Sequence, residues 1–192
     1  MRPEPIILAF DTSAAHCAAA LLMGGRIVTH VDEMSKGQAE HLMPMLSRLL
    51  SDNGITWSDL TAIGVGIGPG NFTGIRIAVS AARGLALALN IPSVGVDGFE
   101  VLAYNSPRPV TVRIAAPRGQ AYVRTLTETG ATDPFLTECD APDPALPGQE
   151  VARRIALITA DRADCQPPRP APLYVRAADA APPRDPAPVI LP

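Results

Sequence analysis

The sequence predicts an α/β fold, in which a mixed sheet begins with three antiparallel strands and continues with alternating helices and strands, followed by a shortened second lobe. Residues 62–91 have the pattern of a buried strand, a glycine turn and a long helix, as expected for a strand covered on both faces. Two alternating segments flank Gly24-Gly25, a two-residue turn typical of hairpins. Sixteen of the 21 prolines lie after residue 106, which predicts a turn-rich second half.

The elements expected in the first half follow the order β-β-β-α-β-α-β-α and occupy residues 6–10, 16–23, 26–32, 41–52, 62–67, 73–90, 93–96 and 98–104. Residues 41–52 place apolar side chains at helical spacing. Pro44 fits only near the start of such a helix, because proline has no N–H to donate. Asn90, with Pro92 close behind it, predicts the end of the long helix.

The second half predicts less regular structure. Alternating residues at 110–115 and 121–126 predict two strands around the turn Arg118-Gly119. Residues 151–158 fit either a short helix or a strand. Residues 160–172 are expected to form a loop, and 173–176 a brief strand or a docked segment.

These patterns divide the chain into three parts. A first lobe is expected at residues 1–106 and a short proline-rich second lobe at 107–179. The remaining residues, 180–192, contain five prolines together with Ala, Arg and Asp, a composition that predicts a disordered tail.

Composition excludes several classes of protein. At 192 residues, 47% of them hydrophobic, the chain is long enough to bury a substantial core. The net charge of −3 provides no overall positive field, so contact with RNA would be local or provided by a partner. Cys17, Cys139 and Cys165 form no C-x-x-C pair, which predicts reduced thiols and neither disulfides nor a zinc knuckle.

The sequence predicts a cytoplasmic chain without membrane contact. The start lacks a signal peptide, because the short apolar run from Ile6 reaches Asp11 at once. The most apolar helix, residues 75–89, has about 15 residues and contains Arg83, so it is expected to be too short and too polar to span a bilayer.

The glycine turn at residues 68–70 has two possible roles. The N–H groups at the start of the following helix suit a phosphate or carboxylate, and Arg76 in the first turn could reach an anion or hold a carboxylate of a neighbouring loop. No lysine follows the glycines and no G-x-G-x-x-G spacing occurs, so neither a P-loop nor a dinucleotide fingerprint is present. A tight structural turn and an anion-binding loop both fit.

Five short segments carry a resemblance. They are Phe10-Asp11-Thr12-Ser13; Glu40-His41 with Leu42-Met43-Pro44; Gly68-Pro69-Gly70-Asn71-Phe72-Thr73-Gly74-Ile75-Arg76-Ile77; Arg118-Gly119-Gln120-Ala121-Tyr122; and Pro172-Leu173-Tyr174-Val175-Arg176. They are similar to segments of the TsaB family, part of the Gcp-like proteins in the actin-like ATPase superfamily, and the third segment is the most specific. The match covers residues 6–127 well and the remainder only in islands.

The resemblance implies both a fold and a role. The fold would be an actin-like ATPase (ribonuclease H-like) lobe with a shortened second lobe. The role would be that of a non-catalytic subunit in the synthesis of threonylcarbamoyladenosine on tRNA. Its implied partners are a TsaD-type catalytic subunit and a TsaE-type ATPase, with tRNA reached indirectly through the complex. Ala116-Pro117-Arg118 departs from the usual D-A-R of the family, so an acidic group is missing there.

The resemblance further implies pairing through the first-lobe helices, as a homodimer when alone and with the TsaD-type subunit in the complex. Small residues repeat along the long helix in two stripes, one of Gly74, Ala78, Ala82 and Ala86 and one of Ser80, Gly84 and Ala88. One stripe suffices for packing on the sheet, which leaves the other for a second helix, either the chain's own helix at 41–52 or a helix of a partner. The expected interface residues are His41, Leu42, Met45, Leu49, Ala78, Ala82 and Ala86.

No catalytic residue is expected, and Asp11 is the best single candidate for one. An acid at the end of the first strand helps to hold Mg²⁺ in actin-like ATPases, so the alternative function is a free-standing ATPase or phosphotransferase that uses Asp11 and the loop 68–74. An anion or nucleotide site of this kind would include Asp11, Thr12, Ser13, Gly68, Gly70, Thr73, Gly74 and Arg76. We favour the structural role, in which Asp11 and Thr12 shape the turn after the first strand.

No cofactor or metal is expected. TsaD-type relatives hold a metal with an H-x-x-x-H pair, whereas His16, His30 and His41 are not spaced in this way. Residues 107–192 lack the G-G turn with which actin-like ATPases bind adenine. A metal-dependent peptidase is discounted for the same lack of a histidine pair.

Overall fold

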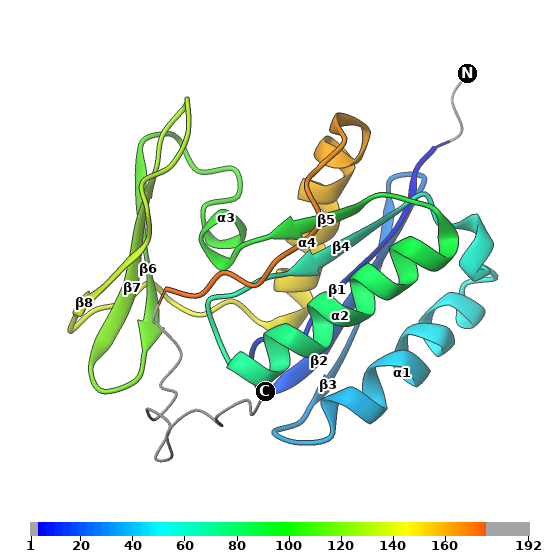
Figure 1. Cartoon of the computed structure of the whole chain (residues 1–192), viewed down its shortest axis with the longest axis horizontal. Coiled ribbons are helices and arrows are strands. Elements are labelled where there is room, and N and C mark those ends of the chain that lie inside the picture. Colours follow the sequence, from blue (N-terminus) through cyan, green and yellow to red (C-terminus); the bar gives the residue numbers. More distant parts are fainter. Residues whose placement is uncertain (1–3, 176–192) are drawn as a thin grey trace, which may run out of the picture.

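The computed structural model describes residues 4–175, which form two sheets side by side (Figure 1). The larger sheet has the strand order β3-β2-β1-β4-β5 and the smaller has the order β6-β7-β8. Strands β1, β2 and β3 are antiparallel, while β1, β4 and β5 are parallel. The expected α/β fold with a mixed sheet and a second, smaller sheet is confirmed.

The strands are β1 (Ile6–Asp11), β2 (His16–Met23), β3 (Arg26–Glu33), β4 (Ala62–Gly66), β5 (Ser93–Val96), β6 (Val110–Ala116), β7 (Gln120–Leu126) and β8 (Phe135–Glu138). The helices are α1 (Gln38–Asp52), α2 (Phe72–Leu89), α3 (Gly98–Leu102) and α4 (Gly148–Arg162), with short 3₁₀ turns at Trp57–Asp59 and Ala163–Cys165. Each element expected in the first half is present. Strand β8, which is short and largely exposed, was not expected.

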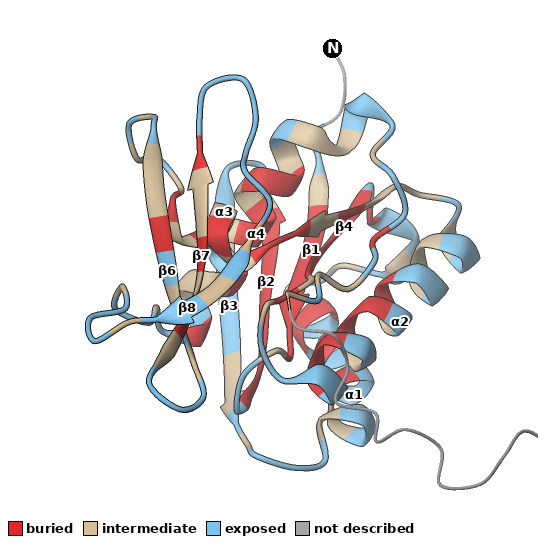
Figure 2. Cartoon of the chain, turned by 60° about the vertical axis from the view of Figure 1, so that its left-hand side comes forward, coloured by how far each residue is buried: buried red, intermediate tan, exposed pale blue. Residues whose placement is uncertain are grey.

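Alternation along β1 directs its two faces toward different helices. Leu8 and Phe10 belong to the core formed with α1 and α2, whereas Ile7 and Ala9 pack with α4. Figure 2 shows β1, β2 and β4 buried almost throughout. The larger sheet is therefore covered on both faces, which explains why these strands are apolar at nearly every position.

Helix α4 is the main feature that the sequence left undecided. Its residues Ala152, Ile155 and Ala156 are completely buried and pack on β1, β2 and β4. Although α4 lies within the range 107–179 assigned to the second lobe, it covers the larger sheet. A division at residue 106 therefore does not separate the two packed units.

Helix α1 begins earlier than the sequence predicts. It starts at Gln38, after Gly37 in the left-handed conformation (φ 83°), so Pro44 lies in its second turn and not near its start. A proline at this position removes one helical hydrogen bond, and its side chain faces solvent.

The last described segment is docked on the larger sheet and does not form a strand. The backbone N–H of Leu173 donates to the carbonyl oxygen of Ile67 at 2.8 Å, and Leu173 packs against the core below the smaller sheet. The predicted disordered tail, 180–192, lies outside the described residues.

Helix α2 has 18 residues, three more than the apolar helix expected at 75–89. Among residues 4–175 it is the one helix long and apolar enough to cross a membrane, by length and composition only. Ile75, Ala78, Val79 and Ala82 are buried against the sheet and α1, as in the core helix of a globular protein, which meets the same criteria.

Candidate functional site

The glycine string after β4 allows the start of α2 to approach the turn that follows β1. The N–H of Asn71 donates to the Ser13 carbonyl oxygen at 2.7 Å, and Thr12 Oγ1 donates to the Gly74 carbonyl oxygen at 2.6 Å. A Cβ on Gly74 would collide with the Thr12 carbonyl oxygen, and one on Gly70 would crowd the Ser13 carbonyl oxygen. Close contact between two backbones therefore requires glycine at both positions.

The groups that an anion would need at the start of α2 already have partners within the chain. Asn71 caps α2 by accepting a hydrogen bond from the Gly74 N–H at 2.9 Å. The Arg76 guanidinium lies 3.8 Å from the centre of the Phe72 ring, and its Nε donates to the Tyr174 hydroxyl at 2.9 Å. The geometry thus favours the structural turn over the anion-binding loop.

The residues predicted for an anion site are divided among three places. Asp11, Ser13 and Gly68 line a cavity between the two sheets. Thr12, Gly70 and Gly74 form the backbone contact just described. Thr73 and Arg76 line a separate groove between α1 and α2. A single site that unites all eight residues is therefore not formed.

Asp11, at the end of β1, is only 3% exposed. Its Oδ2 accepts hydrogen bonds from the Ser13 N–H (3.0 Å), the Ser13 hydroxyl (2.9 Å) and His16 Nε2 (3.1 Å). The Ser13 hydroxyl donates to the Asp11 carboxylate and not to the His16 imidazole. Ser13 and His16 therefore do not form a nucleophile–base pair. Their arrangement is that of a turn shaped by an aspartate.

The pair of His16 and Asp11 makes the stability of the fold depend on pH. The hydrogen bond to Asp11, partly opposed by burial, raises the pKa of His16 above its ordinary value of 6.5. A group with a raised folded-state pKa stabilises the fold fully below its unfolded pKa, and this contribution is lost as pH rises through the folded pKa. We expect the unfolding free energy of the wild type, relative to His16→Gln, to be largest below pH 6.5 and to shrink as pH rises. Urea denaturation across this range measures it, and a pH-independent difference would contradict the expectation.

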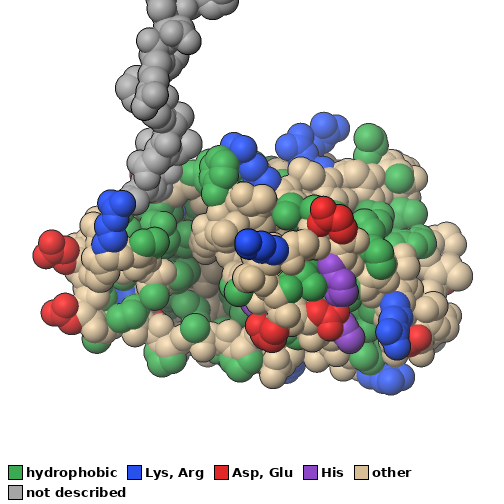
Figure 3. Space-filling view, turned by 90° about the horizontal axis from the view of Figure 1, so that it is seen from below, with side chains coloured by type: hydrophobic (Ala, Val, Ile, Leu, Met, Phe, Trp, Pro, Cys, Tyr) green, Lys and Arg blue, Asp and Glu red, His purple; other side chains and the backbone are tan. Residues whose placement is uncertain are grey.

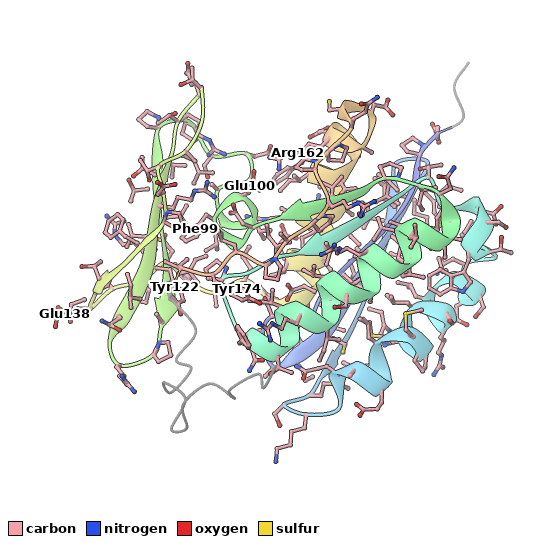
Figure 4. The ribbon with its side chains drawn as sticks, viewed as in Figure 1. Phe99, Glu100, Tyr122, Glu138, Arg162 and Tyr174 are labelled. Atoms are coloured by element: carbon pink, nitrogen blue, oxygen red, sulfur yellow. The ribbon has the colours of Figure 1, made fainter. Side chains whose placement is uncertain are left out.

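A second polar cluster connects α3 with the smaller sheet and with α4. Asp97 caps α3 by accepting from the Glu100 N–H at 2.9 Å and forms an ion pair with Arg124 of β7. Glu100 pairs with Arg162 of α4 at 2.6 Å, and Figure 4 shows these two side chains directed toward each other. Sequence reasoning missed this cluster, since its partners are 27 and 62 residues apart; the only local signal was the Asp97–Glu100 capping box.

Most residues expected at a partner interface are buried within the chain itself. They are Leu42, Met45, Leu49, Ala78 and Ala82, each between 0 and 6% exposed. Only His41 and Ala86 of the expected set are partly exposed. The apolar stripes that the sequence shows are therefore the ones that α1 and α2 use against each other and the sheet.

The outer surface of these helices carries a groove of about 480 Å³, lined by Ala39, Leu42, Met43, Phe72, Thr73, Arg76, Ile77, Ser80 and Ala81. Met43 and Phe72 are 37% and 40% exposed. The second small-residue stripe, Ser80, Gly84 and Ala88, is exposed as well. The exposed surface that a partner could contact therefore lies next to the residues predicted for the interface.

His41 lies beside this groove and shares an acidic partner with His30. Asp32 Oδ2 accepts from His41 Nε2 at 2.6 Å and from His30 Nε2 at 3.1 Å, and the bond from His41 holds the pKa of Asp32 below its usual value. On the face shown in Figure 3, histidine and acidic side chains lie side by side, and basic, acidic and apolar groups alternate. That face has no extended patch of one charge.

Comparison with known proteins identifies relatives. Residues 31–171 match the family model described as "TsaD: tRNA N6-adenosine threonylcarbamoyltransferase". The chain is 33% identical over 121 residues to the tRNA threonylcarbamoyladenosine biosynthesis protein TsaB of Escherichia coli, covering 60% of the chain and 52% of that protein. The TsaB protein of Bacillus subtilis is 36% identical over 120 residues, with coverage of 60% and 52%. The chain spans about half the length of these two relatives.

Other relatives match over nearly their whole length. An uncharacterized protein of Mycobacterium bovis is 30% identical over 198 residues, covering 92% of the chain and 94% of that protein. The structure of YeaZ from Pseudomonas aeruginosa superposes with a TM-score of 0.68 at 26% identity, covering 88% of the chain and 99% of YeaZ. A second Pseudomonas structure, described as similar to peptidase YEAZ, gives a TM-score of 0.72 at 26% identity, covering 90% and 100%. Fold, glycine string and matches together show that the chain belongs to the TsaD family, as a TsaB-type member with the actin-like (ribonuclease H-like) fold.

Proposed function

We propose that this chain is a non-catalytic subunit that binds a TsaD-type catalytic subunit in the cytoplasm. The assembly would transfer a threonylcarbamoyl group to N6 of the adenosine next to the tRNA anticodon. The names of the TsaB relatives, which are biosynthesis proteins for threonylcarbamoyladenosine on tRNA, support the pathway. The observation that carries the binding role is the exposed groove between α1 and α2.

The composition of this groove suits protein binding. Phe72, Met43 and Arg76 belong to the residue types that are enriched at interfaces, and methionine adapts to more than one partner surface. The stacking of Arg76 on Phe72, and its hydrogen bond to Tyr174, hold these side chains in place before any partner binds, which lowers the entropic cost of association. The same surface would serve a homodimer when the protein is alone.

The arrangement at Asp11 supports a non-catalytic role for this chain. One carboxylate oxygen of Asp11 is already bonded to Ser13 and His16. Within the part of the chain that the structure describes, no lysine or arginine lines the cavity there, although phosphate transfer relies on such groups. A TsaE-type ATPase would act as a third protein, and tRNA would be reached through the complex.

The test is size-exclusion chromatography with light scattering, using this protein and the TsaD-type protein of its own organism. The wild type is expected to form a one-to-one complex. Met43→Glu and Phe72→Glu are each expected to weaken the complex by tenfold or more, because each places a charge in the centre of an apolar contact. Circular dichroism should show both variants folded, since both side chains are exposed.

Leu87→Glu is the matched control, because Leu87 lies on the same helix, is 80% exposed and does not line the groove. It is expected to bind as the wild type does. Equal loss of binding in all three variants would show that the partner does not bind specifically in the groove. Absence of any complex, with the TsaE-type protein and ATP also present, would overturn the proposal, and ATP turnover by the isolated chain, lost in Asp11→Ala, would support the ATPase alternative.

A further inference from the structure

A cavity of about 170 Å³ lies between the larger and the smaller sheet. Most of its wall is apolar and comes from β5, α3, β6, the loop before α4, and α4 itself. The larger side chains are Val96, Val101, Leu102, Ile114, Leu146, Val151 and Ile155. An apolar cavity of roughly 150 Å³ holds benzene in another protein. The space therefore suits one small organic molecule and not a nucleotide.

One end of the cavity is polar and buried. Asp11 (3% exposed) and His16 (7% exposed) line it there, together with Ser13. The three hydrogen bonds of Asp11 all go to Oδ2, and Oδ1 has no hydrogen bond within residues 4–175. Oδ1 lies over Gly66, which also lines the cavity, and a Cβ at Gly66 would collide with it. Glycine thus leaves a free carboxylate oxygen accessible from the cavity.

The charges of the lining select the class of ligand. Among residues 4–175, Asp11 is its acidic residue and His16 its histidine, and no lysine or arginine of this part of the chain contributes to it. Once His16 has lost its proton, a phosphate or carboxylate would meet the uncompensated Asp11 carboxylate at a buried position where repulsion is poorly screened. A positively charged donor would instead satisfy Oδ1, the acceptor left unpaired.

We propose that the cavity between the sheets binds a small organic ammonium ion, with its ammonium group on Asp11 Oδ1 and its apolar body against the side chains of Val101, Leu102 and Val151. This role goes beyond the binding of a protein partner through α1 and α2. Apolar walls with a few polar groups at one end are the usual composition of a small-molecule site.

His16 makes this binding depend on pH. The charged groups that act on His16 are Asp11 on β1 and Glu33 on β3, while α4 presents Gly148, without a side chain, to the ring. A protonated His16 neutralises Asp11 and competes with the ligand for it. Ammonium binding is therefore expected to strengthen as pH rises and His16 loses its proton.

The experiment is an NMR titration of the ¹⁵N-labelled full chain with benzylamine, and with benzyl alcohol as the uncharged analogue of the same size. Benzylamine is expected to bind at least tenfold more tightly, to shift the amide signals of Gly66, Gly98 and Val151, and to gain affinity between pH 6 and pH 8. Asp11→Asn keeps the shape of the side chain and is expected to remove the preference for the amine.

Ala145→Trp tests the same cavity without changing Asp11, so the proposal stays testable even where Asp11→Asn does not fold. Ala145 is exposed and lines the cavity, so tryptophan should obstruct the space while Asp11 stays intact, and benzylamine binding should be lost. Equal affinity for amine and alcohol, or no binding of either, would overturn the proposal. Displacement of benzylamine by MgCl₂ or by ATP would also overturn it, because the site would then belong to a metal ion or a nucleotide.

Discussion

Replacement of Gly74 by alanine is expected to lower the free energy of unfolding by about 3 kcal/mol. A Cβ at this position would overlap the carbonyl oxygen of Thr12, and a backbone atom cannot move aside as the end of a side chain can. Relief would require shifting the turn after β1 or the start of α2, where the N–H of Gly74 itself donates the capping hydrogen bond to Asn71. Overpacking of this kind typically costs 1–3 kcal/mol, and more where the neighbour is rigid. Urea denaturation measures the loss.

Gly84→Ala is the matched control in the same helix. Nothing lies within 4 Å of a Cβ at Gly84, and glycine inside a helix is about 1 kcal/mol less favourable than alanine. This variant is expected to be more stable than the wild type by about that amount. If Gly74→Ala were also stabilising, the close approach of α2 to the turn would be wrong.

Replacement of Arg124 by leucine is expected to cost about 3 kcal/mol at neutral pH, the range for breaking a buried ion pair. The partner, Asp97, is only 5% exposed, and removal of Arg124 would leave its charge uncompensated at the junction of the two sheets. Burial, with the nearby charge of Glu100, already raises the pKa of Asp97, and loss of Arg124 would raise it further. The cost is therefore expected to decrease as pH falls and Asp97 becomes protonated.

Denaturation of Arg124→Leu at neutral and at acidic pH checks this sign. The double variant Asp97→Asn/Arg124→Leu is expected to recover much of the loss, because asparagine caps a helix as well as aspartate and carries no charge. Arg153→Leu is the control for an exposed pair with Glu150, where the expected change is within about 0.5 kcal/mol. A double variant no more stable than Arg124→Leu would show that packing, not charge, makes Arg124 important.

Local sequence was sufficient wherever one segment determines its own structure. The hairpin of β2 and β3 follows from alternation on either side of Gly24-Gly25, and both glycines have the positive φ that such a turn requires. The end of α2 follows from Asn90, which adopts the left-handed conformation there. The glycine string and the first strand end were specific enough to indicate the family.

Tertiary structure decided which side of each element faces the core. Sequence periodicity located two stripes of small residues on α2 but could not tell that Ala78 and Ala82 face inward while Gly84 and Ala88 remain exposed. The reason is that both stripes satisfy the same spacing, and burial depends on what α1 and the sheet present to them. For the same reason, periodicity could not tell that Met45 and Leu49, which were expected at the interface, are buried within the chain, whereas Leu42 also lines the groove between α1 and α2.

The polar groups at the cavity and at the sheet junction also depended on the fold. Asp11 was visible in the sequence, but its bond to His16 and its free oxygen over Gly66 arise only when β1, β2 and β4 are aligned. Arg124 and Arg162 meet Asp97 and Glu100 across distant stretches of chain. Sequence alone indicated the family, the turns and every strand but β8, because these depend mainly on neighbouring residues. Long-range packing determined the surfaces and the cavity, because those depend on residues that meet only in the folded chain.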